Sequence, residues 1–197
     1  MKIGVLALQG AVAEHIRMLE QAGAEAVPIK KQEQLAFIDG IIIPGGESTT
    51  IGKLMKTYDF IEPLRQFSQA EKPIFGTCAG LIIIAKEIAD QDGVHLSLMD
   101  MKVARNAFGR QRESFEADLA FKGIADDLKA VFIRAPLIEE VGAGVDVLAE
   151  YEGSIVAARQ GHLLAASFHP ELTDDGRLHS YFIDMVKASK SYKQPID

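Results

Sequence analysis

A single cysteine lies in a segment of this 197-residue chain that could carry nucleophilic chemistry. Cys78 is the centre of Gly-Thr-Cys-Ala-Gly (76–80), which follows an apolar, β-prone stretch and precedes the apolar run 81–85. This order of strand, tight turn and helix is that of a nucleophile elbow, with cysteine in place of serine. A thiolate held there can attack a carbonyl carbon. The alternative is a small buried cysteine that only fills space in the core.

A cysteine nucleophile needs a base, and the base needs a group that orients it. His169 follows an apolar stretch and begins the sequence His-Pro-Glu (169–171). The carboxylate of Glu171, two residues on in extended backbone, can bind the imidazole edge that faces away from sulfur. We therefore predict a relay of Cys78, His169 and Glu171, against the alternative of a chance surface pair. The four other histidines are expected to be solvated rather than catalytic: His15 and His179 in predicted helices, His95 and His162 in polar loops.

Acyl transfer also requires hydrogen-bond donors for the oxyanion. The backbone N–H of Ala79 follows the nucleophile directly, and Gly46 in the pair Gly45-Gly46 follows a predicted strand that should neighbour the elbow strand. An ordinary turn would explain the glycine pair equally well. A phosphate-binding loop would not, because no Gly-Lys-Ser or Gly-Lys-Thr follows. No cluster of cysteine and histidine has metal-ligand spacing, and we expect no metal.

Composition restricts the possible partners and compartment. The net charge of −7 leaves no basic stripe for nucleic acid, and a lone cysteine fits a reducing environment. The apolar run at the start stops at Gln9 and the later one is far too short to span a bilayer, so we expect neither a signal peptide nor a membrane segment. These observations predict a cytoplasmic protein.

The hydrophobic pattern predicts an α/β fold in a single domain spanning residues 1–197. Strands are expected at 3–8, 26–29, 40–43 and 73–77, alternating with helices at 12–22, 48–58 and from about Pro63. Ser48 or Thr49 would cap the second helix. Further β-like stretches follow in the second half, at 98–104, 115–121, 130–133, 145–150, 154–159 and 163–168, and a last helix at 176–188. We predict a three-layer α/β/α sandwich with a mostly parallel central sheet and an antiparallel extension.

Together, the Pro-Gly-Gly loop (44–46), the elbow (76–80) and the His-Pro-Glu pair resemble the class I (triad) glutamine amidotransferases. Longer segments resemble one branch, the glutaminase subunits of pyridoxal 5′-phosphate synthase (the PdxT family). They lie at 4–15, 44–50, 105–111, 132–136 and 167–172, and the resemblance spans the whole chain.

This resemblance implies hydrolysis of L-glutamine to glutamate and ammonia, with Cys78 as nucleophile and His169 and Glu171 as its relay. It implies an oxyanion hole at Gly46 and Ala79, no cofactor, and transfer of ammonia to a synthase subunit (PdxS) that builds pyridoxal 5′-phosphate. The positions that match the family's glutamine-binding residues are Gly46, Glu47, Ser48, Arg105, Ile133 and Arg134.

Three other functions share parts of this pattern. A glutaminase subunit of another pathway, such as imidazole glycerol phosphate synthase, would deliver ammonia to a different acceptor. A cysteine redox sensor or chaperone of related fold would have the elbow, but it would not need the His-Pro-Glu relay. A peptidase would use the same chemistry, but no sequence feature suggests an extended peptide cleft.

Overall fold

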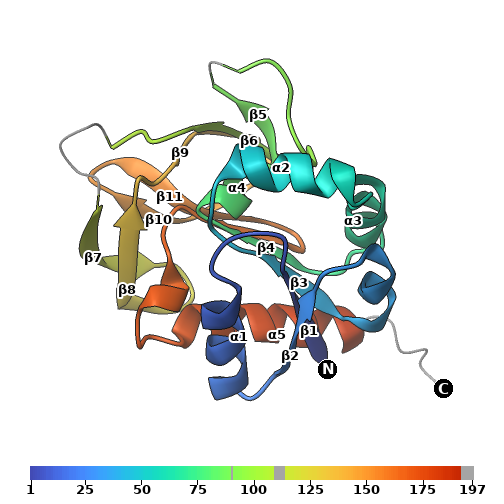
Figure 1. Cartoon of the computed structure of the whole chain (residues 1–197). Helices are drawn as coiled ribbons and strands as arrows, with labels where there is room; N and C mark the ends of the chain where they lie inside the picture. The colour runs from blue at the N-terminus through green and yellow to red at the C-terminus, as the bar shows by residue number, and fades with distance from the viewer. Residues whose placement is uncertain (90, 109–113, 192–197) are drawn as a thin grey trace.

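The computed structural model describes residues 1–89, 91–108 and 114–191 (Figure 1). Within these ranges, one large sheet contains β1 (Lys2–Leu6), β2 (Glu25–Ile29), β3 (Gly40–Ile43), β4 (Ile74–Thr77), β5 (Ala85–Ile88), β6 (Met99–Ala104), β9 (Leu137–Val141), β10 (Asp146–Tyr151), β11 (Ser154–Gln160) and β12 (Leu163–Ala166). A separate hairpin is formed by β7 (Ser114–Phe121) and β8 (Ala125–Ile133). The helices are α1 (Val12–Gln21), α2 (Ser48–Thr57), α3 (Ile61–Gln69), α4 (Ala79–Ile84) and α5 (Arg177–Ser191), with 3₁₀ turns η1 (Gln32–Phe37) and η2 (Pro170–Leu172).

The sheet has a parallel half and a mostly antiparallel half. Its order is β2-β1-β3-β4-β12-β11-β9-β6-β5, with β10 paired to β11. Neighbours from β2 to β12 are parallel, whereas β11 is antiparallel to β12, β9 and β10. The predicted mixed α/β fold is therefore confirmed. β5 and β9 were not predicted from the sequence, and the apolar run expected to stay helical to residue 85 becomes a strand at Ala85.

Helices cover both faces of the parallel half, α2 and α3 on one side and α1 and α5 on the other (Figure 1). Alternate residues of a central strand therefore enter different cores. Ile41 and Ile43 pack in the cluster that contains α2 and α3 residues, and Ile42 packs in the cluster that contains α5 and the β7–β8 hairpin. Burial on both faces explains why these strands are apolar at every position.

The carboxyl ends of β1, β3, β4 and β12 meet at one edge of the sheet, where the predicted site segments follow them. The Cys78 N–H donates to the Ala166 carbonyl (2.8 Å) across β4 and β12, and the Ala11 N–H donates to the Gly45 carbonyl (3.3 Å) between the loops after β1 and β3. In the described part of the chain, no helix combines the length and apolar character needed to cross a membrane.

Candidate active site

Cys78 lies at the sharp turn between β4 and α4. Its backbone has φ 49° and ψ −106°, a combination that residues with a side chain rarely adopt. Glycines on either side make the turn possible, because a Cβ on Gly76 would collide with the Gly80 carbonyl and one on Gly80 with the Ile43 carbonyl. The segment thus has the geometry expected of a nucleophile elbow.

His169 and Glu171 form a close, buried pair. The Nδ1 atom of His169 is 2.6 Å from Oε1 of Glu171, whose side chain is fully buried. Our expectation of extended backbone was wrong at Glu171. His169 has φ −107° and ψ 86°, outside the helical region, but Pro170 begins η2, and the carboxylate reaches the imidazole from this 3₁₀ turn.

The electrostatics of this pair favour a charged imidazole. Burial lowers the pKa of His169, but hydrogen bonds with Cys78 and Glu171 outweigh it and raise that pKa to about 10. Because Nδ1 meets Glu171, Nε2 is the nitrogen left to face the sulfur. Gly45 packs against both residues: a Cβ there would lie 2.5 Å from His169 Cε1 and 3.2 Å from Cys78 Cβ.

The Gly45-Gly46 loop is held by the loop that follows β1. In addition to the Ala11 contact, the N–H of Glu47 donates to the side-chain oxygen Oε1 of Gln9 (2.9 Å). Gln9 was not predicted as part of the site. The available signal was its position as the polar residue that ends the first apolar run of the sequence.

Two of the predicted glutamine-binding segments lie beside each other near the sulfur. The carbonyl of Ile133, at the end of β8, is 3.9 Å from Cys78 Sγ, and exposed Arg134 follows with φ 42°. The N–H of Ala107 donates to the Ala135 carbonyl (3.2 Å), which places the segment of exposed Arg105 alongside. Residues 109–111 of the predicted 105–111 motif lie outside the described part.

Glu47, rather than Ser48 or Thr49, caps α2. Its carboxylate accepts hydrogen bonds from the hydroxyls and amides of Thr49 and Thr50. The two hydroxyls are the main cause of a pKa lowered to about 2, so the carboxylate stays ionised even at a pH where an ordinary glutamate is protonated. Ser48 is buried at the first position of the helix. A fixed negative charge therefore lies beside Gly46.

The prediction that His15 and His179 are solvated was wrong. Both side chains are fully buried, and Nδ1 of His15 is 2.9 Å from Nε2 of His179. His95 is half-buried against α2, and His162 bonds the hydroxyl of Ser68 (2.8 Å). The solvent exposure of His15 and His179 was predicted wrongly because a histidine counts as polar in a hydrophobicity pattern, even on the inner face of a helix such as α1 or α5.

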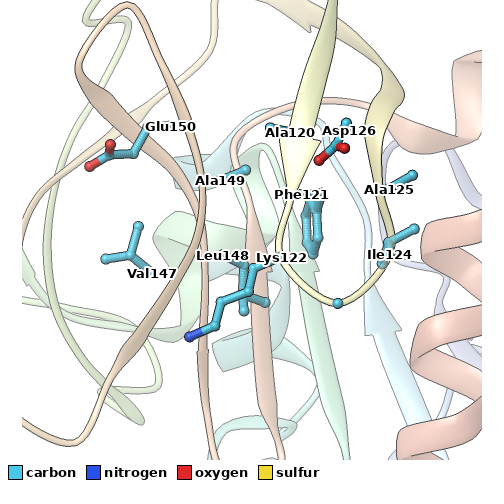
Figure 2. Close-up of a pocket in the computed structure, with 11 residues that line it drawn as sticks. Ala120, Phe121, Lys122, Ile124, Ala125, Asp126, Val147, Leu148, Ala149 and Glu150 are labelled. Atoms are coloured by element: carbon cyan, nitrogen blue, oxygen red, sulfur yellow. The ribbon is translucent and has the colours of Figure 1, made fainter.

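A surface hollow of about 700 Å³ has a different set of lining residues, which Figure 2 shows. It is lined by the β7–β8 turn and by β10, and it contains none of the predicted site residues. Over the three described ranges, no group of three His, Cys, Asp or Glu side chains is arranged to hold a metal ion.

Comparison with known proteins agrees with this geometry. A sequence model of the SNO glutamine amidotransferase family matches residues 5–188. The chain belongs to this family. It is 69% identical to the pyridoxal 5′-phosphate synthase subunit PdxT of Niallia circulans, over 96% of this chain and all of that one. It is 68% identical to the subunit of the same name from Anoxybacillus flavithermus, over 96% of this chain and 98% of that one.

A solved structure supports the same assignment. A crystal structure described as a glutamine amidotransferase superposes with a TM-score of 0.90 at 47% identity, covering 94% of this chain and 98% of that one. The resemblance predicted from the three short motifs is therefore confirmed at the level of the family and the fold.

Proposed function

We propose that this chain is the glutaminase subunit of a pyridoxal 5′-phosphate synthase, and that it supplies ammonia for vitamin B6 biosynthesis. The observation that carries the proposal is the meeting of Cys78 with the His169–Glu171 pair at one sheet edge, in a chain of this family. We treat residues 1–197 as one glutaminase domain.

The reaction begins when the Cys78 thiolate attacks the side-chain amide carbon of L-glutamine. His169 donates its proton to the departing ammonia, which leaves a γ-glutamyl thioester. His169 then takes a proton from water, and the resulting hydroxide releases glutamate and the thiolate. Glu171 keeps Nδ1 of His169 engaged, so that Nε2 carries the transferred proton.

The backbone N–H groups of Ala79 and Gly46 stabilise the oxyanion of both tetrahedral intermediates. Each donor contributes about 3–4 kcal/mol to lowering the barrier. The hydrogen bond from the Glu47 N–H to Gln9 holds the loop that contains Gly46. The direction of the Gly46 N–H therefore depends on the conformation of this loop.

Charged residues in the proposed glutamine-binding segments suit the two ends of an amino acid. The Glu47 carboxylate is ionised and can receive the substrate ammonium group, while Arg105 and Arg134 offer planar donors for the α-carboxylate. Gly46, Ser48 and Ile133 complete the proposed binding site. Glutamine would then lie between the loop after β3 and the end of β8, with its side-chain amide at Cys78.

The ammonia acceptor in this proposal is the synthase subunit PdxS, and the complex is cytoplasmic. To test this, ammonia release from L-glutamine is measured for the chain alone, with PdxS, and with the cyclase subunit of imidazole glycerol phosphate synthase. We expect strong stimulation by PdxS and formation of pyridoxal 5′-phosphate from ribose 5-phosphate and glyceraldehyde 3-phosphate. Stimulation by the cyclase subunit instead would assign the chain to the other pathway.

A further inference from the structure

A buried cluster of polar side chains adjoins Oε2 of Glu171, the carboxylate oxygen that does not contact His169. His15, Thr77, Glu171 and His179 are all fully buried. His15 lies among the other three: Nδ1 is 2.9 Å from His179 Nε2, and Nε2 is 3.1 Å from Thr77 Oγ1 and 3.5 Å from Glu171 Oε2. One imidazole therefore touches both the residue before Cys78 and the carboxylate that holds His169.

Both rings of the histidine pair are neutral at pH 7. Burial, reinforced by His179 and His169, lowers the pKa of His15 well below its usual value, and burial lowers that of His179 to about 4. A neutral imidazole has one N–H and one bare nitrogen, so the pair can be arranged in two ways.

Hydrogen bonding favours one of these arrangements. If His179 Nε2–H donates to His15 Nδ1, then His15 Nε2–H faces Thr77 and Glu171. The atom left without a partner among the described residues, His179 Nδ1, is then a bare nitrogen. The reverse arrangement would leave that atom as a buried, unpaired N–H and would turn a bare nitrogen of His15 toward a carboxylate. Unpaired buried donors are costly and rare, so the first arrangement is favoured.

We infer that His15, fixed by His179 as the Nε2–H tautomer, is a positioning residue for the Glu171 carboxylate. Oε2 of Glu171 has no hydrogen-bond partner among the described residues, and its 3.5 Å contact with His15 is electrostatic rather than a hydrogen bond. Contacts of this kind often tighten when substrate binds. By attracting Oε2, His15 limits rotation of the carboxylate and keeps Oε1 on His169. This role rests on the proposed function, in which Glu171 orients the proton carrier.

The first test is independent of catalysis. Long-range ¹H–¹⁵N spectra of the full chain with ¹⁵N-labelled histidine report the protonation and tautomer of each ring, with assignments from His15→Gln and His179→Gln. We expect both rings to be neutral with hydrogen on Nε2 at pH 7. A charged His15, or hydrogen on its Nδ1, overturns the inference. An inactive wild-type complex would refute the proposed function, but the spectrum would still report the tautomers of His15 and His179.

The second test distinguishes the contributions of Nδ1 and Nε2 of His15 to activity, in the complex with the synthase subunit. A glutamine amide reaches about as far as Nε2, whereas an asparagine amide reaches only the position of Nδ1. We expect His15→Gln to keep kcat within about threefold of wild type and His15→Asn to lower it about tenfold, with KM unchanged in both. His162→Gln, at the opposite end of β12, is the matched control. Equal losses for the two variants, or a greater loss for glutamine, would refute a role through Nε2.

A double-mutant cycle shows whether His15 acts through Glu171. In a Glu171→Gln background, His15→Asn should reduce kcat by less than about twofold, because the carboxylate that His15 positions is already absent. If the two losses multiply in full, His15 does not act through Glu171 and the inference is wrong.

Discussion

Cys78 holds a backbone conformation that costs about 1–3 kcal/mol for a residue with a side chain. Such a residue is retained for what its side chain does rather than for packing, and the neighbouring groups fit a chemical role. His169 is held on one side by Glu171 and faces the sulfur on the other. The roles of these two residues in our proposal differ, because His169 moves the proton whereas Glu171 only orients it.

This difference predicts unequal losses of activity. His169→Ala removes the proton carrier and should lower the glutaminase kcat of the complex by about 10²–10⁴-fold. Glu171→Gln keeps His169 as the proton carrier and should lower kcat by a smaller factor. Steady-state ammonia release measures both variants, with His162→Gln as the control for loss of an unrelated histidine. A greater loss for Glu171→Gln would mean that the two roles are assigned the wrong way round.

The sequence was sufficient to predict that Cys78, His169 and Glu171 lie together, because each lies in a short motif. It was not sufficient for His15 and His179. These residues are 164 positions apart and meet only because α1 and α5 pack side by side on one face of the sheet. Their burial is a tertiary property, which a pattern of polar and apolar residues along one helix does not report.

The same limit applies to the secondary-structure elements. The apolar strands β3 and β4 were predicted within a residue, since burial on both faces leaves a continuous apolar run, whereas β1 and β12 were predicted to end two residues later than they do. The boundary between α4 and β5 was missed because a run of isoleucines fits either a buried helix or a buried strand, and no glycine or proline marks the change. β9, with two adjacent glutamates, lacks the alternation expected of a strand.

The loop after β3 is the element whose conformation should control activity. Gly46 supplies a proposed oxyanion donor, and a Cβ there would meet the Gln9 oxygen that accepts from Glu47. Gly46→Ala should therefore lower synthase-stimulated ammonia release far more than the basal rate of the free chain. Alkylation of Cys78 by a small reagent should change less than turnover when the synthase is added, because the elbow is a separate element.

Titration of the glutaminase with synthase tests this loop directly. A rate per glutaminase subunit that stays constant through saturation would contradict control by the loop. The alkylation rate serves as the control, since it reports access to the thiol rather than the state of the oxyanion hole.

For the whole molecule, the buried histidines make the free energy of unfolding depend on pH. His179 has a pKa of about 4 when folded and an ordinary value near 6.5 when unfolded, so between these pH values the unfolded chain binds more protons. Stability is therefore lost as pH falls through this range. His179 alone accounts for about 2 kcal/mol of unfolding free energy between pH 7 and pH 5, and His15 acts in the same direction.

Urea unfolding of wild type, His179→Leu and His162→Gln at pH 7 and pH 5 measures this effect. His179→Leu should lose less stability on acidification than wild type, whatever its stability at pH 7, and His162→Gln should behave as wild type does. Equal losses in wild type and His179→Leu would show that His179 is not held neutral in the folded chain.

Glutamine hydrolysis in this proposal passes through a thioester on Cys78, which acid quenching of the working complex should trap. The glutaminase is mixed with the synthase subunit and isotopically labelled L-glutamine, quenched during turnover and digested, and the peptide that contains Cys78 is examined by mass spectrometry. We expect a γ-glutamyl group on Cys78 that hydroxylamine removes, and less than about one tenth of wild-type ammonia release in Cys78→Ala. Full ammonia release by Cys78→Ala, or a label carried on another residue, would contradict it.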